Sequence, residues 1–576
     1  MKSLHELPLA DKLLIVDDAH ERTDSKVLFQ FAASTRTQTK LLIVTRSYGQ
    51  SLLRSQAAQF FPDDSTEKSV KLGPLSVNDS IALAEQVLSH LGADIRTAGQ
   101  IAKFTQDNIL ATVIAAYTVA KENLRVDLIS TDKNFERLVT SRFQDVLTGK
   151  LGVEGQEKNI KSILKLIALL QPLDVSREEF AHLALTNEHI QTADTVFLLK
   201  VLEISGVIYK RAGRHRLSPD MLADYIVEQV CEDVHKSSAD YLDTLLEILP
   251  NHLLKNLLLN LSKCDWRQRL SDTAKIDFLS STWRKIFADE SNLSFLSELA
   301  YYQPERALKI VEEHIRAGNL LEVLTEIAKN ASYNLEFTKR ACSALWELGK
   351  NNKRTLNQTP SHGIRLLQEM CQCKPGTSTA AVHHAIDFAL SCLENNETGC
   401  AYSPFDVLKG VMKTEGSVIT PSGPGSISIG QFHVPISWVA DSRQRIIEAT
   451  CRWIRRQGND SRCIMAGKFL GSSFYHPANY NESEQEEWDL QFLRELQYVK
   501  ENVDFNRFYP FALVEMLRGL NFHITHGNPK IASVIYEIES AADELAFKLS
   551  RGMIDGYGDL THEKDYEQRI RRITFG

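Results

Sequence analysis

The chain has 576 residues, of which 43% are hydrophobic and 24% charged, with a formal net charge of −8. Because a domain typically holds about 100–200 residues, this length predicts several domains. The negative charge disfavours nucleic acid and anionic membranes as partners, and no apolar run approaches the ~20 residues that span a bilayer. The first residues lack the apolar stretch of a signal peptide, and nine scattered cysteines are typical of reduced thiols, so we expect a cytoplasmic protein without a membrane partner.

The first 75 residues carry a strand–helix–strand pattern. The runs Leu13–Asp18 and Lys40–Ser47 each contain a continuous apolar stretch, which is typical of parallel strands covered on both faces. The segment Asp24–Ser34 between them has a helical pattern, and Lys68–Leu75 predicts a third short strand. This order predicts a right-handed crossover in an open parallel sheet.

The rest of the chain is predominantly helical. Ser76 and Asp79 form a capping-box-like start for a helical segment. Three helical patterns and two β-rich runs around Ala212–Gly213 then predict a winged helix, and a later Ser-, Gly- and Pro-rich stretch predicts a β-hairpin or ordered loop with its turn at Pro421–Gly425.

We therefore expect a mostly α fold class with a partial α/β unit at the start and irregular α-helical repeats after the winged helix. The expected parts are an α/β core at 1–75, a helical lid at 76–130, the winged helix at 131–232, α-helical repeats at 233–405, the hairpin or loop at 406–440, and a helical region at 441–576.

Polar residues follow both apolar strands, at the edge where parallel strands end. Phosphoryl transfer from ATP needs a magnesium ion, an aspartate that holds it and a positioned water. Asp17 is placed to hold Mg²⁺ through water, and Asp18 to orient the attacking water. The second strand ends in Thr45 and Arg46, and this arginine is placed to contact the γ-phosphate. The alternative is a purely structural strand end, where aspartate is also common.

At these positions the chain resembles the STAND-type NTPases, signal-transduction P-loop ATPases that include apoptosis and plant disease-resistance switches and bacterial antiphage sensors. In that family a Walker B strand ends in paired aspartates and a sensor strand ends in Thr/Ser–Arg. A helical lid and a winged helix with a nucleotide-reading motif follow. The matching residues are Asp17 and Asp18; Thr45–Arg46; Leu72, Leu75, Ser76, Asp79 and Ser80; DNILA (Asp107–Ala111), where the family has G-N-P-L-A; and Asp220 of RLSPDMLADYI, with Pro219 where the family has histidine. The resemblance covers roughly residues 12–230 by motif and order, and the rest by architecture.

The resemblance implies a truncated P-loop NTPase core at 1–75 and a regulatory switch that uses ATP or ADP and Mg²⁺. It implies helical repeats that sense a protein ligand, homo-oligomerisation controlled by nucleotide state, and a setting in antiviral defence. It gives catalytic roles to Asp18 and Arg46 and metal binding to Asp17. Residues expected to contact the nucleotide are Asp17, Thr45, Asn108, His215 and Asp220.

The sequence departs from the family at the phosphate-binding loop. The motif G-x-x-x-x-G-K-[ST] is absent, and Ile109 replaces the proline of the lid motif. We therefore do not expect ATP hydrolysis by the chain as given. Two explanations stay open: a piece of a longer protein, or a non-hydrolysing relative. The retained Asp17, Asp18 and Arg46 favour the first, so ATP and Mg²⁺ are expected cofactors of the intact protein, and this chain alone need not bind them.

Other sequence features point to alternatives. The main alternative is an interaction scaffold whose helical repeats bind a protein while the α/β part binds no nucleotide. A DNA-binding regulator would use the basic hairpin with Lys210, Arg211, Arg214 and Arg216, but acidic surroundings and the net charge make nucleic acid an unlikely partner. The stretch 371–400 holds cysteines and histidines without metal-ligand spacing, so we expect its cysteines to be buried small hydrophobic residues.

Overall fold

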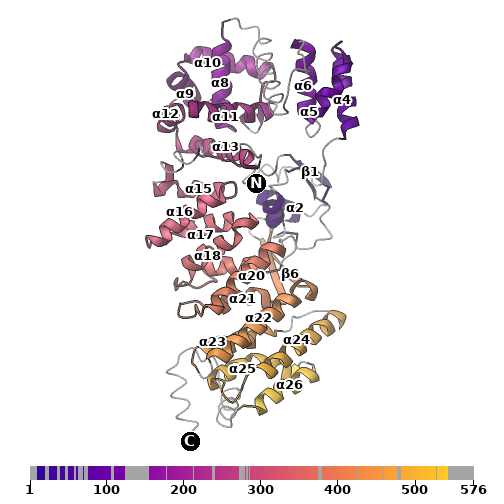
Figure 1. Ribbon diagram of the computed structural model, residues 1–576, viewed down its shortest axis with the longest axis vertical. Helices are drawn as coiled ribbons and strands as arrows, with labels where there is room; N and C mark the ends of the chain where they lie inside the picture. Colours follow the sequence, from indigo (N-terminus) through magenta and orange to yellow (C-terminus); the bar gives the residue numbers. More distant parts are fainter. Residues whose placement is uncertain are drawn as a thin grey trace. The chain divides into compact units, whose positions relative to one another are not determined.

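The computed structural model is mostly helical and divides into two compact units, which we describe separately (Figure 1). The first unit combines residues 1–68 with 304–576, and the second holds 69–303. The residues that the structure describes are 10–17, 19, 25–34, 39–45, 50–57, 60–61, 69–70, 76–105, 109–122, 155–176, 178–211, 213–218, 220–236, 240–270, 279, 283, 286–287, 289–373, 379–423, 426–457, 460–475, 482–526 and 528–542.

The first unit begins with the predicted parallel strand pair. Its elements are β1 (Lys12–Val16), α2 (Ser25–Ser34), β2 (Thr39–Ile43) and α3 (Gln50–Ala57). The strands β1 and β2 pair in parallel, with Val16 opposite Ile43. One face of the pair packs on the two helices through a small core of Val16, Ala19, Phe29 and Leu53. The sequence prediction of two parallel strands joined by a helix is therefore confirmed.

The other face of this strand pair differs from the prediction. The register places Leu13 and Ile15 beside Leu42, and these side chains are 59%, 61% and 49% exposed. Parallel sheets are normally covered by helices on both faces, yet the two helices of this segment pack on one face only. Complete burial of the strands is thus wrong for the described residues. Of the predicted third strand Lys68–Leu75, only Ser69 and Val70 are described, and neither lies in a strand.

The helix α2 also lies against the helical part of the same unit. It contacts the hairpin strand β5 (Glu415–Gly423). The pKa of Lys26 is lowered overall, because desolvation and the charge of Lys329 outweigh the opposite effect of Glu326 and Glu369. Lys26 remains exposed to solvent, but its ammonium group lies within the electrostatic reach of these three side chains. The α/β segment and the helical array therefore belong to one packed body.

Helices of the first unit stack in two layers. In the first layer, each of α16, α18, α20, α22, α24 and α26 contacts the next, and in the second layer the same holds for α17, α19, α21, α23 and α25. This pattern of contacts is typical of a helical repeat array. The bounds are α16 Pro304–Arg316, α17 Glu322–Ala331, η7 Leu335–Phe337, α18 Thr338–Gly349, α19 Gly363–Cys371, α20 Thr379–Glu394, α21 Pro404–Met412, α22 Ile436–Gln457, α23 Cys463–Ser473, α24 Glu482–Asn502, α25 Pro510–His526 and α26 Pro529–Ser540.

A β-hairpin interrupts the array where the sequence predicts one. The strands β5 and β6 (Ser426–His433) pair in antiparallel register from Glu415↔His433 to Gly423↔Ser426, with an irregularity between Pro421 and Gly423. Of the predicted turn Pro421–Gly425, the last two residues lie outside the described part. Glycine, proline and serine near the tip explain why the chain reverses here.

The second unit starts with a small bundle of its own. It comprises α4 (Val77–His90), η4 (Ile95–Thr97), α5 (Ala98–Thr105) and α6 (Ile109–Glu122). The predicted start of α4 is confirmed, because Ser76 Oγ accepts a bond of 3.1 Å from the amide of Asp79 and donates one of 2.6 Å to its carboxylate. The core between the three α-helices is formed largely by alanine, leucine, isoleucine and valine side chains.

Three helices and a hairpin form the next part of this unit. The helices are α8 (Glu157–Leu170), α9 (Glu178–Glu188) and α10 (Thr192–Ile204), and the hairpin strands are β3 (Ile208–Arg211) and β4 (Arg214–Leu217). The hairpin is antiparallel, as predicted around Ala212–Gly213, and Gly213 takes a φ of +80° that favours glycine. The backbone of Leu173 pairs with His215 through two bonds, which adds a bridge beside β4.

Further helices complete the second unit. They are α11 (Asp220–Lys236), α12 (Asp240–Ile248), α13 (Asn251–Leu270), η6 (Glu290–Asn292) and α15 (Leu293–Leu299). Two asparagines of α13 bind the free carbonyl groups at the end of α8. Asn256 Nδ2 donates to the carbonyls of Leu170 and Pro172, both at 3.0 Å. Asn260 Nδ2 donates to those of Leu169 and Gln171 at 2.9 and 2.8 Å.

We expect Asn260→Ala to destabilise the α8–α13 contact by about 1–3 kcal/mol, because it leaves two part-buried carbonyls without their donor. Native-state hydrogen exchange of amides in both helices measures this free energy of opening. Asn251→Ala, at an exposed position of α13, is the matched control and should change it by less than about 0.5 kcal/mol. Equal effects of the two substitutions would show that the asparagine bridges do not stabilise the fold.

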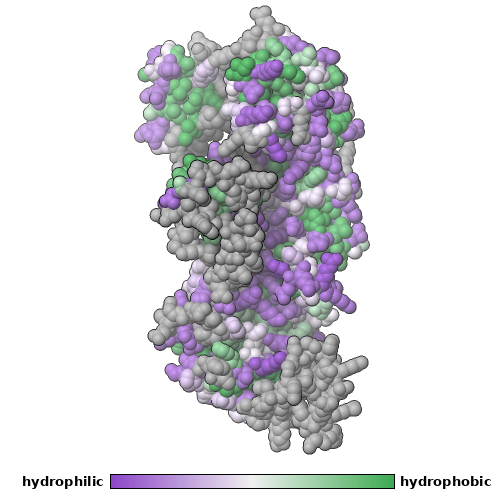
Figure 2. Space-filling view, turned by 180° about the vertical axis from the view of Figure 1, so that it is seen from behind, coloured by the Kyte–Doolittle hydropathy of each residue, from purple (hydrophilic) through white to green (hydrophobic). Residues whose placement is uncertain are grey.

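On the face seen in Figure 2, apolar residues form separate patches among hydrophilic ones. Within the described ranges, every helix is too short or too polar to cross a membrane.

Candidate functional site

The carboxyl ends of β1 and β2 bring two of the predicted site residues to one edge. Asp17 follows β1 directly and is exposed, and Thr45 lies just beyond β2. Two backbone hydrogen bonds continue the pairing past the strand ends. The amide of Val44 donates to the carbonyl of Val16 at 2.8 Å, and the amide of Ala19 donates to the carbonyl of Val44 at 2.9 Å. These bonds hold the backbone on either side of Asp17 against the segment that carries Thr45.

Three predicted site residues lie outside the described part of the chain: Asp18, Arg46 and Asn108. Their catalytic and nucleotide-binding roles stay predictions. Residues next to them are described, and Asp18 and Arg46 follow Asp17 and Thr45 directly in the chain. In the sequence Asn108 lies between Thr105 and Thr112, whose Oγ1 atoms share a hydrogen bond of 2.8 Å that ties α5 to α6.

His215 and Asp220 belong to the second unit. His215 is only 3% exposed, and burial and the charge of Lys210 lower its pKa, so its imidazole is neutral near pH 7. Nδ1 of this ring has no hydrogen-bond partner among the described residues. Asp220 is the first residue of α11, and its side chain lies outside the described part. The roles of both residues as nucleotide contacts stay predictions.

The chemistry of the strand edge fits magnesium. A carboxylate and a hydroxyl are the hard oxygen donors that Mg²⁺ prefers, and this ion commonly uses one or two protein carboxylates together with substrate phosphates and water. Asp17 is exposed and can serve such an ion through a water molecule. Among the described residues, no group of three or more His, Cys, Asp or Glu side chains forms a complete metal cage.

The cysteines of the stretch 371–400 lie partly in the core of the array. Cys371 and Cys392 are buried, whereas Cys373 and Cys400 are half-buried. Burial raises the pKa of Cys392 to about 12, and also raises that of Cys371. A thiol must lose its proton to bind a metal, so these groups behave as small apolar side chains, as the sequence predicts.

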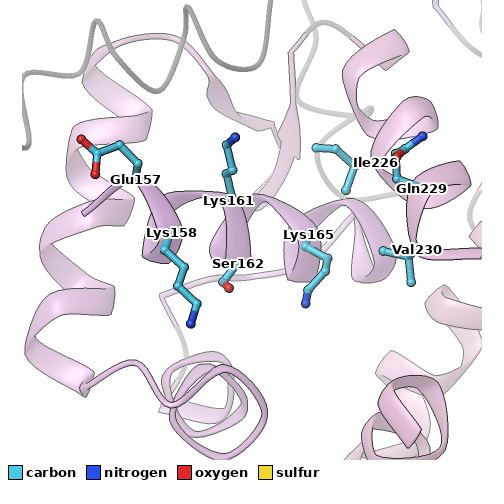
Figure 3. Close-up of a pocket in the computed structure, with 8 residues that line it drawn as sticks. All are labelled: Glu157, Lys158, Lys161, Ser162, Lys165, Ile226, Gln229 and Val230. Carbon is cyan, nitrogen blue, oxygen red and sulfur yellow. The ribbon is translucent and has the colours of Figure 1, made fainter. Parts of the chain in front are cut away.

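A groove lies between α8 and α11 of the second unit (Figure 3). Its volume is about 460 Å³, and it is open to solvent. Lys158, Ser162 and Lys165 extend to one side of α8, and Lys161 extends to the other. The apolar side chains of Ile226 and Val230 contribute from α11.

One lysine of this groove, Lys165, forms a triad with Glu188 and Tyr241. Lys165 Nζ lies 2.8 Å from Glu188 Oε1 and 3.8 Å from the centre of the Tyr241 ring. The hydroxyl of Tyr241 donates to the same carboxylate at 2.6 Å. Burial and the neighbouring Glu188 raise the pKa of Tyr241, so this hydroxyl keeps its proton. The triad joins α8, α9 and α12 and fixes the position of the lysine ammonium group.

The helix before the basic hairpin presents apolar side chains to solvent. Val196, Phe197 and Ile204 of α10 are 46%, 53% and 89% exposed, and Lys200 is exposed among them. On the hairpin, Lys210 and Arg214 are exposed, whereas the side chain of Arg211 lies outside the described part. A DNA-reading helix requires groups that bond to bases and phosphates, and this apolar side offers few of them.

Comparisons with known proteins leave the chain without an assigned relative. No model of a known protein family matches it. No curated protein matches it. No solved structure matches it.

Several of these features were missed from the sequence. The groove lysines are visible in the sequence as a polar stripe on an amphipathic helix, but such a stripe is equally typical of an ordinary solvated helix face. Nothing local indicates that Glu188 and Tyr241 meet, since 53 positions separate them. The exposed apolar side of α10 is visible in the sequence, because Val196, Phe197 and Ile204 lie one and seven positions apart and so share one side of a helix.

Proposed function

We propose that the protein is an ATP-dependent regulatory switch with a STAND-like organisation. In this proposal the carboxyl ends of β1 and β2 bind the phosphates of ATP with Mg²⁺, the part from α8 to β4 acts as a winged helix, and the helical array senses a protein partner. Nucleotide state would control homo-oligomerisation. Hydrolysis is not part of the proposal for the chain as given, because it lacks the G-x-x-x-x-G-K-[ST] motif.

The observation that carries the proposal is the placement of Asp17 and Thr45 at one edge of a parallel strand pair. In open α/β sheets, ligands bind outside the carboxyl ends of the strands. Asp17 would hold the magnesium ion through water, and the hydroxyl of Thr45 would donate toward the phosphates. Asp18 and Arg46 follow them in the chain, where one orients a water and the other contacts the γ-phosphate. When bound, the magnesium ion would supply charge neutralisation for the phosphates.

A second observation supports coupling between this edge and the helical array. Only a short segment of chain separates Asp17 from Lys26, whose ammonium group lies near Lys329, Glu326 and Glu369 of the array. A ligand that changes the strand edge therefore acts close to α17 and α19. The order of the elements supports a winged helix, because the helices α8, α9 and α10 precede the antiparallel hairpin β3–β4. The backbone of Leu173 also pairs with His215 of the second strand of this hairpin.

We expect the chain to bind Mg·ATP and Asp17→Ala to weaken that binding about 10–100-fold, the range found when a group behind a metal-bound water is removed. Isothermal titration calorimetry with and without magnesium measures the affinity. Asp11→Ala is the matched control, because Asp11 is exposed at the opposite end of the same strand. Binding that survives Asp17→Ala unchanged would contradict the proposed site.

The second candidate is a scaffold that binds a protein through its helices and no nucleotide. The two-layer array and the absent phosphate-loop motif favour it. The same titration separates the two functions, since a chain without measurable Mg·ATP affinity fits the scaffold alone.

A further inference from the structure

The helix α10 carries an exposed seam opposite the side that it buries. The seam residues are exposed and follow one another at intervals of four, three and four positions: Ala193, Phe197, Lys200 and Ile204. This is the spacing by which one helix packs along another in a coiled-coil contact. On the other side of α10, the fully buried residues are Thr195, Leu198 and Leu202. Within its own chain α10 therefore packs through one side, and the seam stays open to solvent.

The seam combines large apolar side chains with one lysine. Phe197 and Ile204 are 53% and 89% exposed, and Val196 at the edge of the seam is 46% exposed. Single exposed apolar residues are common on protein surfaces, but several on one side of a helix are typical of an interaction site. Lys200 lies between Phe197 and Ile204 and forms no ion pair with any residue that the structure describes. The seam thus offers apolar contacts and an ammonium group to a partner helix.

The seam complements a second copy of itself in antiparallel orientation. When two α10 helices lie antiparallel with their midpoints together, Ala193 of one copy faces Ile204 of the other, and Phe197 faces Lys200. A small side chain then meets a large one, and an ammonium group meets an aromatic ring, which is an attractive cation–π contact. Each contact occurs twice, as in the isologous interface of a symmetric dimer. In a parallel pair, by contrast, each Lys200 would face the other, so the antiparallel orientation is favoured.

From this self-complementarity we propose that the protein forms a symmetric dimer through antiparallel packing of α10 on α10 of a second copy. The contact buries Phe197 and Ile204, while the stem of Lys200 lies along the facing ring and its ammonium group reaches the rim. Four seam residues per copy make a small interface, so the dimer is weak, with a Kd of about 1–100 µM. The inference goes beyond the proposed nucleotide switch, because it concerns a surface that includes neither Asp17 nor Thr45.

Two other occupants fit the seam less well. A helix that reads duplex DNA presents basic and amide side chains to the bases and phosphates, whereas the seam presents Lys200 among apolar residues. A helix of another protein would have to place a large apolar residue against Ala193 and an aromatic one against Lys200. A second copy supplies both of these residues at the required positions.

Sedimentation equilibrium of the full chain, in reducing buffer without nucleotide, tests the proposal at concentrations from well below to well above this Kd. Phe197→Lys places a lysine against each Lys200 of the other copy. The double variant Phe197→Lys, Lys200→Phe exchanges the two residues, so each ring again faces an ammonium group while the composition stays the same. Leu320→Lys is the matched control, because Leu320 is 54% exposed and lies in the other unit. Circular dichroism confirms that each variant keeps its helix content.

We expect the unmodified chain to show a monomer–dimer equilibrium and Phe197→Lys to weaken association at least about tenfold, because like charges then face each other. The exchanged variant should associate within about threefold of the unmodified chain, and Leu320→Lys should leave association unchanged. An unmodified chain that stays monomeric, an equal loss with Leu320→Lys, or no recovery in the exchanged variant would each overturn the proposal. Since nucleotide is omitted, these results do not depend on Mg·ATP binding at the strand edge.

Discussion

Replacing Arg443 by alanine should destabilise the helical array around it by about 3–5 kcal/mol, because Glu495 would keep a buried and uncompensated charge. Both side chains are fully buried. Arg443 Nε and Nη2 donate to the two oxygens of this carboxylate at 3.0 and 2.8 Å. The guanidinium group also lies over the rings of Trp488 and Phe492, each 5.3 Å away.

The same guanidinium group binds the ends of two helices. Its Nη1 donates to the carbonyl of Met412 and its Nη2 to that of Ser473, both at 2.8 Å. These are the last residues of α21 and α23, where backbone carbonyls have no partner within their own helix. Arg443 of α22 and Glu495 of α24 thus join four helices, which explains why a charged pair occupies the core.

Arg445→Ala is the matched control for this prediction. Arg445 lies on the same helix and pairs with Asp387 at 2.5 Å, but both side chains are substantially exposed, so its loss should cost less than about 1 kcal/mol. Native-state hydrogen exchange of α22 and α24 measures both free energies of opening. A double replacement of Arg443 and Glu495 by methionine should restore part of the loss. Equal effects of the two arginine variants would contradict the assigned role.

The second large effect is expected at the crossing of α23 and α25, where Gly467→Ala should cost about 1–3 kcal/mol. A Cβ atom on Gly467 would stand 2.1 Å from the carbonyl oxygen of Ala512. The close contact continues one turn further along α23, at Gly471. A Cβ atom on Gly519 of α25 would lie 2.4 Å from the backbone of Gly471. The two helix backbones touch directly, so an added methyl group must push them apart.

Gly399→Ala in the same unit provides the comparison. A Cβ at Gly399 meets nothing within 4 Å, and its backbone is not in the left-handed region. This substitution should leave stability unchanged or raise it slightly, since alanine restricts the unfolded chain. Hydrogen exchange of α23 and α25 reports the difference. If Gly467→Ala opens these helices no more easily than Gly399→Ala does, the close crossing does not exist in solution.

Local patterns in the sequence predicted much of the fold. Continuous apolar runs indicated the parallel pair β1–β2, Ser76 and Asp79 indicated the start of α4, and Ala212–Gly213 indicated the hairpin. Each of these depends on residues that are close in the chain. The predicted helical repeats also agree with the two-layer stack of the first unit.

Contacts between distant residues could not be predicted in this way. Arg443 and Glu495 are 52 positions apart, and neither of their neighbourhoods reveals a buried pair. Asn260 reaches carbonyls about 90 positions earlier in the chain. The prediction that both faces of β1 and β2 are covered was wrong. An apolar run shows that a strand can be buried, but it does not show which helices are present to bury it.

The candidate site shows the same division. The sequence placed Asp17 and Thr45 at the ends of two strands, and the register of β1 and β2 brings those ends to one edge. Whether a nucleotide is bound there depends on groups that no local pattern specifies. The proposed switch requires Mg·ATP to bind at this edge.

Hydrogen–deuterium exchange of the full chain with and without Mg·ATP measures binding at this edge. If Mg·ATP binds there, exchange slows in peptides covering 10–17, 25–34 and 39–45 when nucleotide is present, with no change in the groove helices α8 and α11. The protection should disappear in Asp17→Ala and persist in Asp11→Ala. Unchanged exchange across the strand edge at saturating Mg·ATP, or protection that appears only elsewhere in the chain, would show that this edge is not a nucleotide site.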